Sequence, residues 1–222
     1  MPFVVRDGAR LYWRSDGAPA RPALLLGNSI GTDHALWAPV MPALQRHFRV
    51  LRFDARGHGG SEAPPGECTM AMLAEDALAV ADAAGAARFH YMGISIGGMV
   101  GIWLGAHAAD RVDRLVLCNT AATLPANLWA ERIARVRAGG MAAIVDAVLS
   151  RWFTARYLAR ADGNLASARA TLLAVDPDGY IGCCAAIRDM DIVADLKTIR
   201  APTLVTTGTY DMATPKDLGV AI

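Results

Sequence analysis

Apolar runs separated by turn residues open the sequence and predict a β-hairpin. Phe3-Val4-Val5 and Leu11-Tyr12-Trp13 flank Asp7-Gly8, a short turn dipeptide between two β-prone runs. Further apolar runs, typical of strands buried in a sheet, occur at 22–26, 48–53, 89–91, 114–119 and 203–207. The chain therefore begins as a hairpin and continues with strands that we expect to share one sheet.

Helical spacing follows several of these strands. Leu73, Ala77 and Val80 recur on one helical face, and Thr69 before them is a good N-cap for a helix that runs to Gly85. Strands and helices then alternate along the chain. This alternation predicts an α/β fold with a mostly parallel sheet and helices on both of its faces.

The alternation stops after residue 121. Helices without an intervening strand are predicted at 127–138, 141–152, 164–174 and 179–188, with a Gly139-Gly140 break after the first. An all-helical insertion between two strands is typical of a lid over a site. We therefore expect a core of residues 1–121 and 191–222, its last helix and strand truncated, and a helical lid of residues 122–190.

Composition narrows the class of protein. Of the 222 residues 54% are hydrophobic, and this length suits one globular domain. The 22 basic and 21 acidic residues leave a net charge of +1, which provides no broad field for nucleic acid or an anionic membrane. The four cysteines lack metal-site spacing and are expected to be reduced and mostly buried. Charged residues near the start interrupt any signal-peptide core, so we expect a cytoplasmic location.

A serine between two glycines is the strongest chemical signal. Gly93-Ile94-Ser95-Ile96-Gly97 fits the nucleophile-elbow pattern G-x-S-x-G, in which small residues let a strand turn sharply and lift the serine hydroxyl above the sheet. The preceding residues alternate as a strand does, and 99–109 contain no proline and continue as a helix. The uncharged stretch 89–109 also has the length of a membrane span, but its scattered glycines and histidines favour the elbow.

Two further loops follow predicted strands and carry candidate groups. Asp211 lies after Ser95 in the chain, and we expect this carboxylate to orient a catalytic base, while Thr214 suits a helix N-cap better. The backbone N–H of Ile30 is a candidate donor to a developing oxyanion. His58, in a glycine-rich loop, is interpreted as a residue that orients backbone rather than as the base.

Together these motifs resemble the α/β-hydrolase family, and more narrowly the 3-oxoadipate enol-lactonases of aromatic-compound degradation. The resemblance spans nearly the whole chain and rests on segments 27–33, 54–61, 93–98, 115–121, 135–141 and 179–186. It implies that Ser95 attacks the carbonyl of a small carboxylated enol-lactone while the N–H groups of Ile30 and Ile96 hold the oxyanion. The ring then opens through an acyl-enzyme to 3-oxoadipate, and no cofactor takes part.

A carboxylated substrate needs a cation, which the predicted lid supplies in several places. Its candidate arginines are Arg132, Arg135, Arg137 and Arg151. We predict Arg132, together with Trp129, as a substrate contact. The alternatives are solvated helix surface for the arginines and, for the aromatic residues Trp129, Trp152, Phe153 and Tyr157, packing within the lid.

The sequence departs from the family in its histidines. All five precede Asp211, whereas the family places its catalytic histidine on a loop after the acid. We therefore expect a closing helix, a strand and a histidine loop, about 30 residues, to be missing. Since removing the histidine of a serine protease costs about 10⁶-fold in turnover, the chain as written is expected to be nearly inactive. The alternative is a complete protein that recruits another base.

Two other functions stay open. One is another hydrolase of the same fold, such as a carboxylesterase, a perhydrolase or a carbon–carbon bond hydrolase, and the other is a non-catalytic binding protein that uses the same pocket. The sequence carries no metal cluster, phosphate loop or dinucleotide fingerprint, which favours hydrolysis of a small ester or lactone without metal or cofactor. No nucleic-acid or membrane partner is expected, and the oligomeric state is not predicted.

Overall fold

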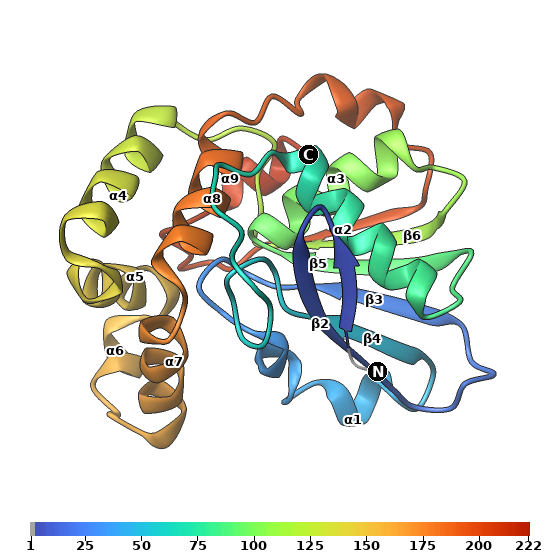
Figure 1. Ribbon diagram of the computed structural model, residues 1–222, viewed down its shortest axis with the longest axis horizontal. Helices are drawn as coiled ribbons and strands as arrows, with labels where there is room; N and C mark the ends of the chain where they lie inside the picture. Colours follow the sequence, from blue (N-terminus) through green and yellow to red (C-terminus); the bar gives the residue numbers. More distant parts are fainter. Residues whose placement is uncertain (1–2) are drawn as a thin grey trace.

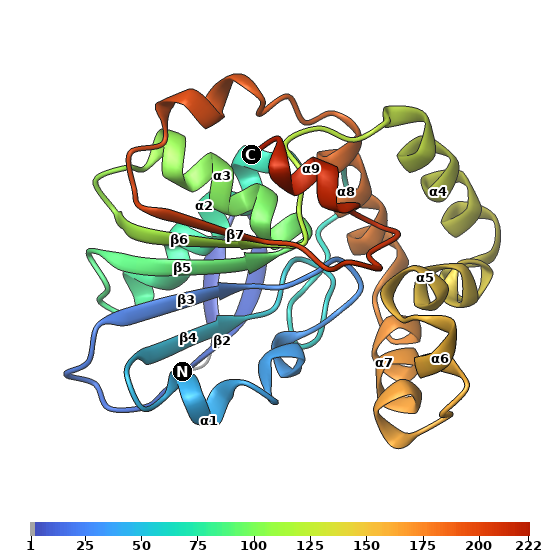
Figure 2. The ribbon, with the colours of Figure 1, turned by 180° about the vertical axis from the view of Figure 1, so that it is seen from behind.

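A mixed sheet organises the computed structural model, which describes residues 3–222. Within these residues the sheet has seven strands in the order β1-β2-β4-β3-β5-β6-β7 (Figures 1 and 2). The strands are β1 Phe3–Arg6, β2 Ala9–Asp16, β3 Ala23–Gly27, β4 Arg49–Phe53, β5 Phe89–Ile94, β6 Val112–Cys118 and β7 Thr203–Thr206. In this order, neighbouring strands from β4 to β7 are parallel. The pairs β1–β2 and β2–β4 are antiparallel. The α/β fold with a mostly parallel sheet is thereby confirmed.

The predicted hairpin forms where the turn dipeptide stands. Arg6 pairs with Ala9 across the turn. Asp7 and Gly8 both have positive φ, 44° and 75°, as a tight two-residue hairpin turn requires. An aspartate followed by a glycine adopts this backbone at low cost, so the local sequence favours the hairpin turn.

Strand β3 is apolar throughout because both of its faces are covered. Leu25 faces the main core with helices α2 (Met70–Ala83) and α3 (Ile96–His107). Leu24 and Leu26 face a smaller cluster with η1 (His34–Trp37) and α1 (Met41–Leu44). Successive side chains of a strand point to opposite faces, so a strand between two helical layers has no polar face to alternate with. Figure 2 shows α2 and α3 on one side of the sheet and α1 on the other.

Helix α2 begins where the sequence predicts. The Thr69 side chain accepts a hydrogen bond from the N–H of Met72 at 3.1 Å, which satisfies a backbone donor that has no partner within the helix. The helix ends at Ala83, two residues before the predicted limit. A capping threonine thus marks a helix start that tertiary contacts do not override.

The helices predicted between the two parts of the core form one block beside the sheet (Figure 1). They are α4 Ala126–Gly139, η2 Met141–Ala143, α5 Val145–Trp152, α6 Ala155–Leu158, α7 Gly163–Leu173 and α8 Pro177–Arg188. Residues 126–188 are all described and contain no strand. The short helix α6 was not predicted, and 141–152 divides into η2 and α5. The division of the chain into core and lid domains stays a prediction.

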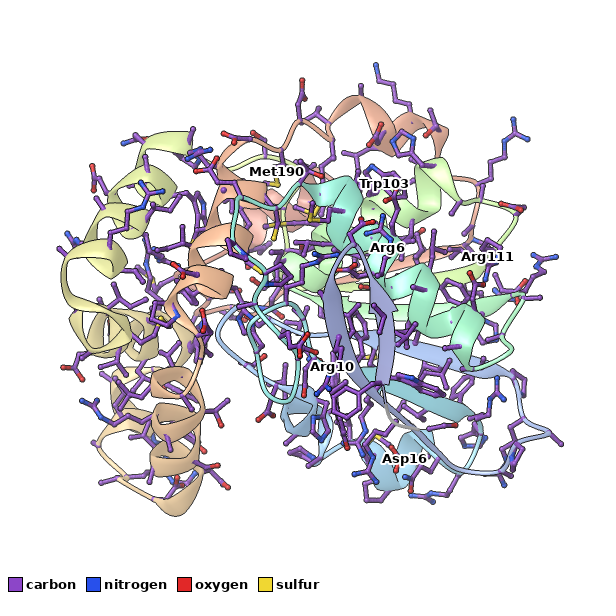
Figure 3. The ribbon with its side chains drawn as sticks, in the orientation of Figure 1. Arg6, Arg10, Asp16, Trp103, Arg111 and Met190 are labelled. Atoms are coloured by element: carbon purple, nitrogen blue, oxygen red, sulfur yellow. The ribbon has the colours of Figure 1, made fainter. Side chains whose placement is uncertain are left out.

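A buried ion pair joins the loop after β4 to helix α2. Arg56 donates to both carboxylate oxygens of Asp76, at 2.6 and 2.7 Å, and the two side chains are 4% and 2% exposed. Arg6, labelled in Figure 3, reaches the same carboxylate from β1 and also pairs with Glu75. These contacts hold the hairpin, helix α2 and the loop after β4 together. Separating them is unfavourable, because breaking the pair would leave a charge buried without a partner.

The four cysteines are free and buried, as predicted. Among residues 3–222 no single helix is long and apolar enough to cross a membrane, and α7 and α8, which reach that length only together, meet at 91°.

Candidate active site

Ser95 stands at a sharp turn between β5 and α3. Its φ of 57° and ψ of −123° lie outside the conformations that side-chain-bearing residues usually adopt, and its N–H donates to the Cys118 carbonyl at 3.0 Å. A Cβ on Gly93 would lie 2.2 Å from the Gly97 carbonyl oxygen, and one on Gly97 would lie 2.2 Å from that of Gly27. Both glycines are therefore sterically required, which is the physical content of the G-x-S-x-G pattern.

Asp211 follows β7 and is surrounded by donors. Oδ2 accepts from Asn119 Nδ2 at 2.6 Å and from Thr214 Oγ1 at 2.8 Å, and Oδ1 accepts from the N–H groups of Ala213 and Thr214 at 2.7 and 3.0 Å. Burial acts to raise the pKa of Asp211, but the hydrogen bonds from Asn119 and Thr214 outweigh it, so the pKa lies below its ordinary value. This carboxylate is ionised at neutral pH.

The prediction that Thr214 caps the next helix is wrong. Helix α9 (Lys216–Val220) has Pro215 at its N-cap position and no side-chain capping bond. The Thr214 hydroxyl donates to Asp211 instead, because an ionised acceptor 2.8 Å away forms the stronger hydrogen bond.

Ser95 and Asp211 line the same cavity, of about 480 Å³. Loops at the carboxyl ends of β3, β5, β6 and β7 form one wall, and the segment 151–154, from the end of α5 to the residue before α6, forms the other. The lining residues are Ser29, Thr32, Leu36, Ile94, Ser95, Asn119, Arg151, Trp152, Phe153, Thr154, Gly208, Thr209, Tyr210, Asp211, Ala213 and Thr214. Among the residues that the structure describes, no histidine lines this cavity.

The two predicted oxyanion donors belong to segments in direct contact. Ile96 is the first residue of α3, so its N–H has no acceptor within the helix. The loop that carries Ile30 is joined to the elbow by the N–H of Gly97, which donates to the Asn28 carbonyl at 3.1 Å. The side chains of Ile30 and Ile96 are both buried, 4% and 5% exposed, which anchors the backbone of the two segments.

Trp129 and Arg132 lie outside this cavity. Both belong to α4, where the Arg132 guanidinium lies 4.5 Å from the centre of the Trp129 ring. Arg132 lines a neighbouring hollow of about 180 Å³ between α4 and α5. Arg151 lines both spaces and is the candidate arginine that reaches Ser95's cavity. Helical spacing gives no indication of which lid arginine faces the core, so the sequence could not distinguish them.

Asn119 is a site residue that sequence reasoning missed. It directly follows β6, with a φ of 45° that an asparagine tolerates better than most residues. Its position at the carboxyl end of a central parallel strand was the available signal, because ligand sites of such sheets gather there. His58 is buried and bonds the Gly31 N–H and the Arg56 carbonyl, in agreement with its interpretation as a residue that orients backbone.

Comparison with known proteins gives a consistent result. The family described as alpha/beta hydrolase fold matches residues 22–221. A 3-oxoadipate enol-lactonase of Acinetobacter baylyi is 36% identical over 211 residues, which are 94% of this chain and 79% of that protein. The crystal structure of a hydrolase from Pseudomonas aeruginosa is 48% identical with a TM-score of 0.97, covering 99% of this chain and 84% of that one. An enol-lactonase from Burkholderia xenovorans is 42% identical with a TM-score of 0.97, covering 99% and 86%.

Proposed function

The chain belongs to the α/β-hydrolase fold family, and from this premise we propose that it is a serine hydrolase that opens a small carboxylated enol-lactone. The observation that carries the proposal is Ser95, held at a φ of 57° on the wall of the cavity that Asp211 also lines. The enol-lactonase names of two similar proteins support the substrate class. The product of this reaction is an open-chain oxo acid.

In the proposed mechanism the Ser95 hydroxyl oxygen attacks the lactone carbonyl as a base removes its proton. The N–H groups of Ile30 and Ile96 stabilise the negative charge on the carbonyl oxygen, which is the largest single contribution in acyl transfer. The ring C–O bond then breaks, and the departing enolate takes up a proton and becomes a ketone. Water hydrolyses the ester bond to Ser95 and regenerates the hydroxyl. The ionised Asp211 carboxylate is the group that would orient an imidazole base, and none of the histidines within residues 3–222 lines this cavity.

Arg151 is the cation that we assign to the substrate's carboxylate. The lid arginines Arg137, Arg160 and Arg169 each pair with a carboxylate of the protein. Among the residues that the structure describes, Arg151 has no such partner, and it lines the cavity beside Trp152. A guanidinium left unpaired in a largely apolar cavity is suited to a carboxylated ligand.

The test compares the enol-lactone with the neutral ester p-nitrophenyl acetate. For Arg151→Ala we expect kcat/KM on the lactone to fall about 10-fold to 100-fold, since a hydrogen bond to a charged group is lost, with the neutral ester unchanged. Arg132→Ala, on the same lid but outside the cavity, is the matched control. Equal losses on both substrates would contradict the assignment, and hydrolysis that persists in Ser95→Ala would contradict the proposed function.

A non-catalytic binding protein is the second candidate. The observation in its favour is that, within residues 3–222, no histidine lines the cavity of Ser95. A fluorophosphonate probe separates the two candidates, because it modifies an activated serine and leaves an inert one unlabelled. Labelling that disappears in Ser95→Ala supports the hydrolase.

A further inference from the structure

His58 lies buried between its own loop and the loop that carries Ile30. It is 1% exposed. The N–H of Gly31 donates to its Nε2 at 2.9 Å, and its Nδ1 lies 2.8 Å from the Arg56 carbonyl oxygen. Because Nε2 accepts a hydrogen bond and a carbonyl oxygen can only accept, the ring proton is on Nδ1. These contacts therefore select one neutral tautomer of the imidazole.

Burial favours the same neutral form. It lowers the pKa of His58, although the backbone carbonyl and the charges of Asp54, Asp33 and Asp176 act to raise it. The ring of Tyr180, on α8, lies 6.4 Å away at a tilt of 31°. At neutral pH the Nε2 lone pair is thus available to the Gly31 N–H.

The segment that carries His58 is fixed from two directions. The N–H of Asp176 donates to the Gly57 carbonyl at 2.9 Å, and a Cβ on Gly57 would lie 2.5 Å from the Cα of Gly179. The ion pair with Asp76 holds the neighbouring Arg56. The backbone around His58 is therefore held in place by contacts with the start of α8 and with α2.

The loop that it contacts is a tight turn. Both the N–H and the hydroxyl of Thr32 donate to the Ser29 carbonyl, at 3.2 and 2.7 Å, which closes a turn around Ile30 and Gly31. Gly31 has a φ of +82°, and a Cβ there would lie 2.6 Å from Cδ1 of Leu172 in the lid. The turn thus lies between the lid and His58, and the bond to Nε2 fixes the peptide that follows Ile30.

We propose that His58 is a positioning residue that holds the Ile30 N–H in the orientation in which it binds an oxyanion. The proposal rests on the proposed function, in which Ile30 supplies one of the two donors. His58 itself touches no reacting atom and acts through the Gly31 amide. A donor misplaced by about 1 Å costs about 10²-fold in rate, so a single hydrogen bond behind the turn has a measurable effect on turnover.

The first measurement uses NMR and does not depend on catalytic activity. In the ¹⁵N-labelled protein we expect a scalar coupling across the hydrogen bond between the Gly31 amide nitrogen and His58 Nε2. In His58→Leu, amide hydrogen exchange at Ile30 and Gly31 is expected to accelerate at least about 10-fold, whereas His58→Gln, whose side-chain oxygen can accept the same N–H, retains protection. Absence of the coupling in the unmodified protein would overturn the proposal even if His58→Leu failed to fold.

The second measurement follows Ser95 itself. The rate of Ser95 labelling by a fluorophosphonate, and kcat for p-nitrophenyl acetate, are expected to fall about 10-fold to 100-fold in His58→Leu, with KM nearly unchanged, and to recover in His58→Gln. His107→Leu, which removes an exposed histidine paired with Asp195, is the control and should match the unmodified protein.

The two measurements separate two kinds of failure. If Ser95 is never labelled, the proposed function fails, while the coupling and the exchange rates still show whether His58 positions the turn. If Ser95 is labelled equally fast in His58→Leu, the positioning role is wrong and the hydrolase stands.

Discussion

At the scale of single residues, the site combines a strained serine with a fully occupied carboxylate. Asp211 accepts four hydrogen bonds, about as many as the lone-pair positions of a carboxylate, and two of them reach Oδ2 from Asn119 and Thr214. An imidazole that is to be oriented by Asp211 must therefore compete with Asn119 for Oδ2.

This competition predicts a chemical rescue. Added imidazole should increase the rate of Ser95 labelling by a fluorophosphonate, because a positioned general base contributes about 10²–10⁴-fold and a freely diffusing one a part of this. In Asn119→Ala, where one position on Oδ2 is vacated, we expect the increase to be larger. The measurement is the labelling rate as a function of imidazole concentration. Asp211→Asn is the control, and an equal response in that variant would refute a role for the carboxylate.

At the scale of elements, the elbow depends on backbone contacts that leave no space for a methyl group. A Cβ on Gly97 would meet the carbonyl oxygen and carbon of Gly27 at 2.2 and 2.4 Å. Gly27 belongs to β3 and Gly97 to α3, so neither backbone can move away without moving a whole element. The glycine after the serine therefore sets the distance between the helix and the sheet.

Gly97→Ala is expected to destabilise the protein by about 1–3 kcal/mol, as overpacking of a tight interior does. Gly163→Ala provides the matched control, because a Cβ there meets nothing within 4 Å and alanine favours helix α7. Urea unfolding at neutral pH measures both. A Gly97→Ala protein as stable as the control variant would show that the elbow can expand.

The elements were largely predictable, whereas the contacts between them were not. Asp7-Gly8, Thr69 and the glycines around Ser95 act through their own backbone or their immediate neighbours, so their sequence signals were reliable. Thr214 was assigned to the wrong hydrogen bond because its true partner is an ionised carboxylate whose position depends on the fold. Arg151 could not be chosen over Arg132 for the same reason, since only the packing of the lid decides which arginine reaches the cavity.

At the scale of the whole molecule, the start of helix α8 and the turn after β3 both contact the loop of one buried titratable group, His58. The loop of His58 touches the start of α8 through Gly57, and His58 itself bonds the turn that leads from β3. Protonating His58 would remove its acceptor and place a charge where burial already lowers its pKa. Stability is thereby linked to pH at this one position.

The sign of the pH effect follows from the lowered pKa. The unfolded chain binds a proton at His58 below about pH 6.5, whereas the folded protein resists doing so, and protons therefore favour unfolding. The contribution of neutral His58 is complete above about pH 6.5 and is lost as the pH falls from there toward the folded pKa. We expect the free energy of unfolding to fall more steeply over this range in the unmodified protein than in His58→Gln. We would measure the free energy of unfolding of both proteins by urea unfolding at several pH values. The same dependence on pH in both proteins would contradict this linkage.

The N-terminus of helix α3 influences charge at Ser95 as well as packing. The peptide dipoles of an α-helix add up to a partial positive charge at its N-terminus, and Ser95 is the N-cap of this buried 12-residue helix, whose first turn contains no acid. Dissolved ions screen such a field weakly inside a protein. Negative charge that develops on the Ser95 oxygen as a base removes its proton is therefore stabilised by the backbone itself, and this stabilisation should persist in concentrated salt solutions that weaken interactions among surface charges.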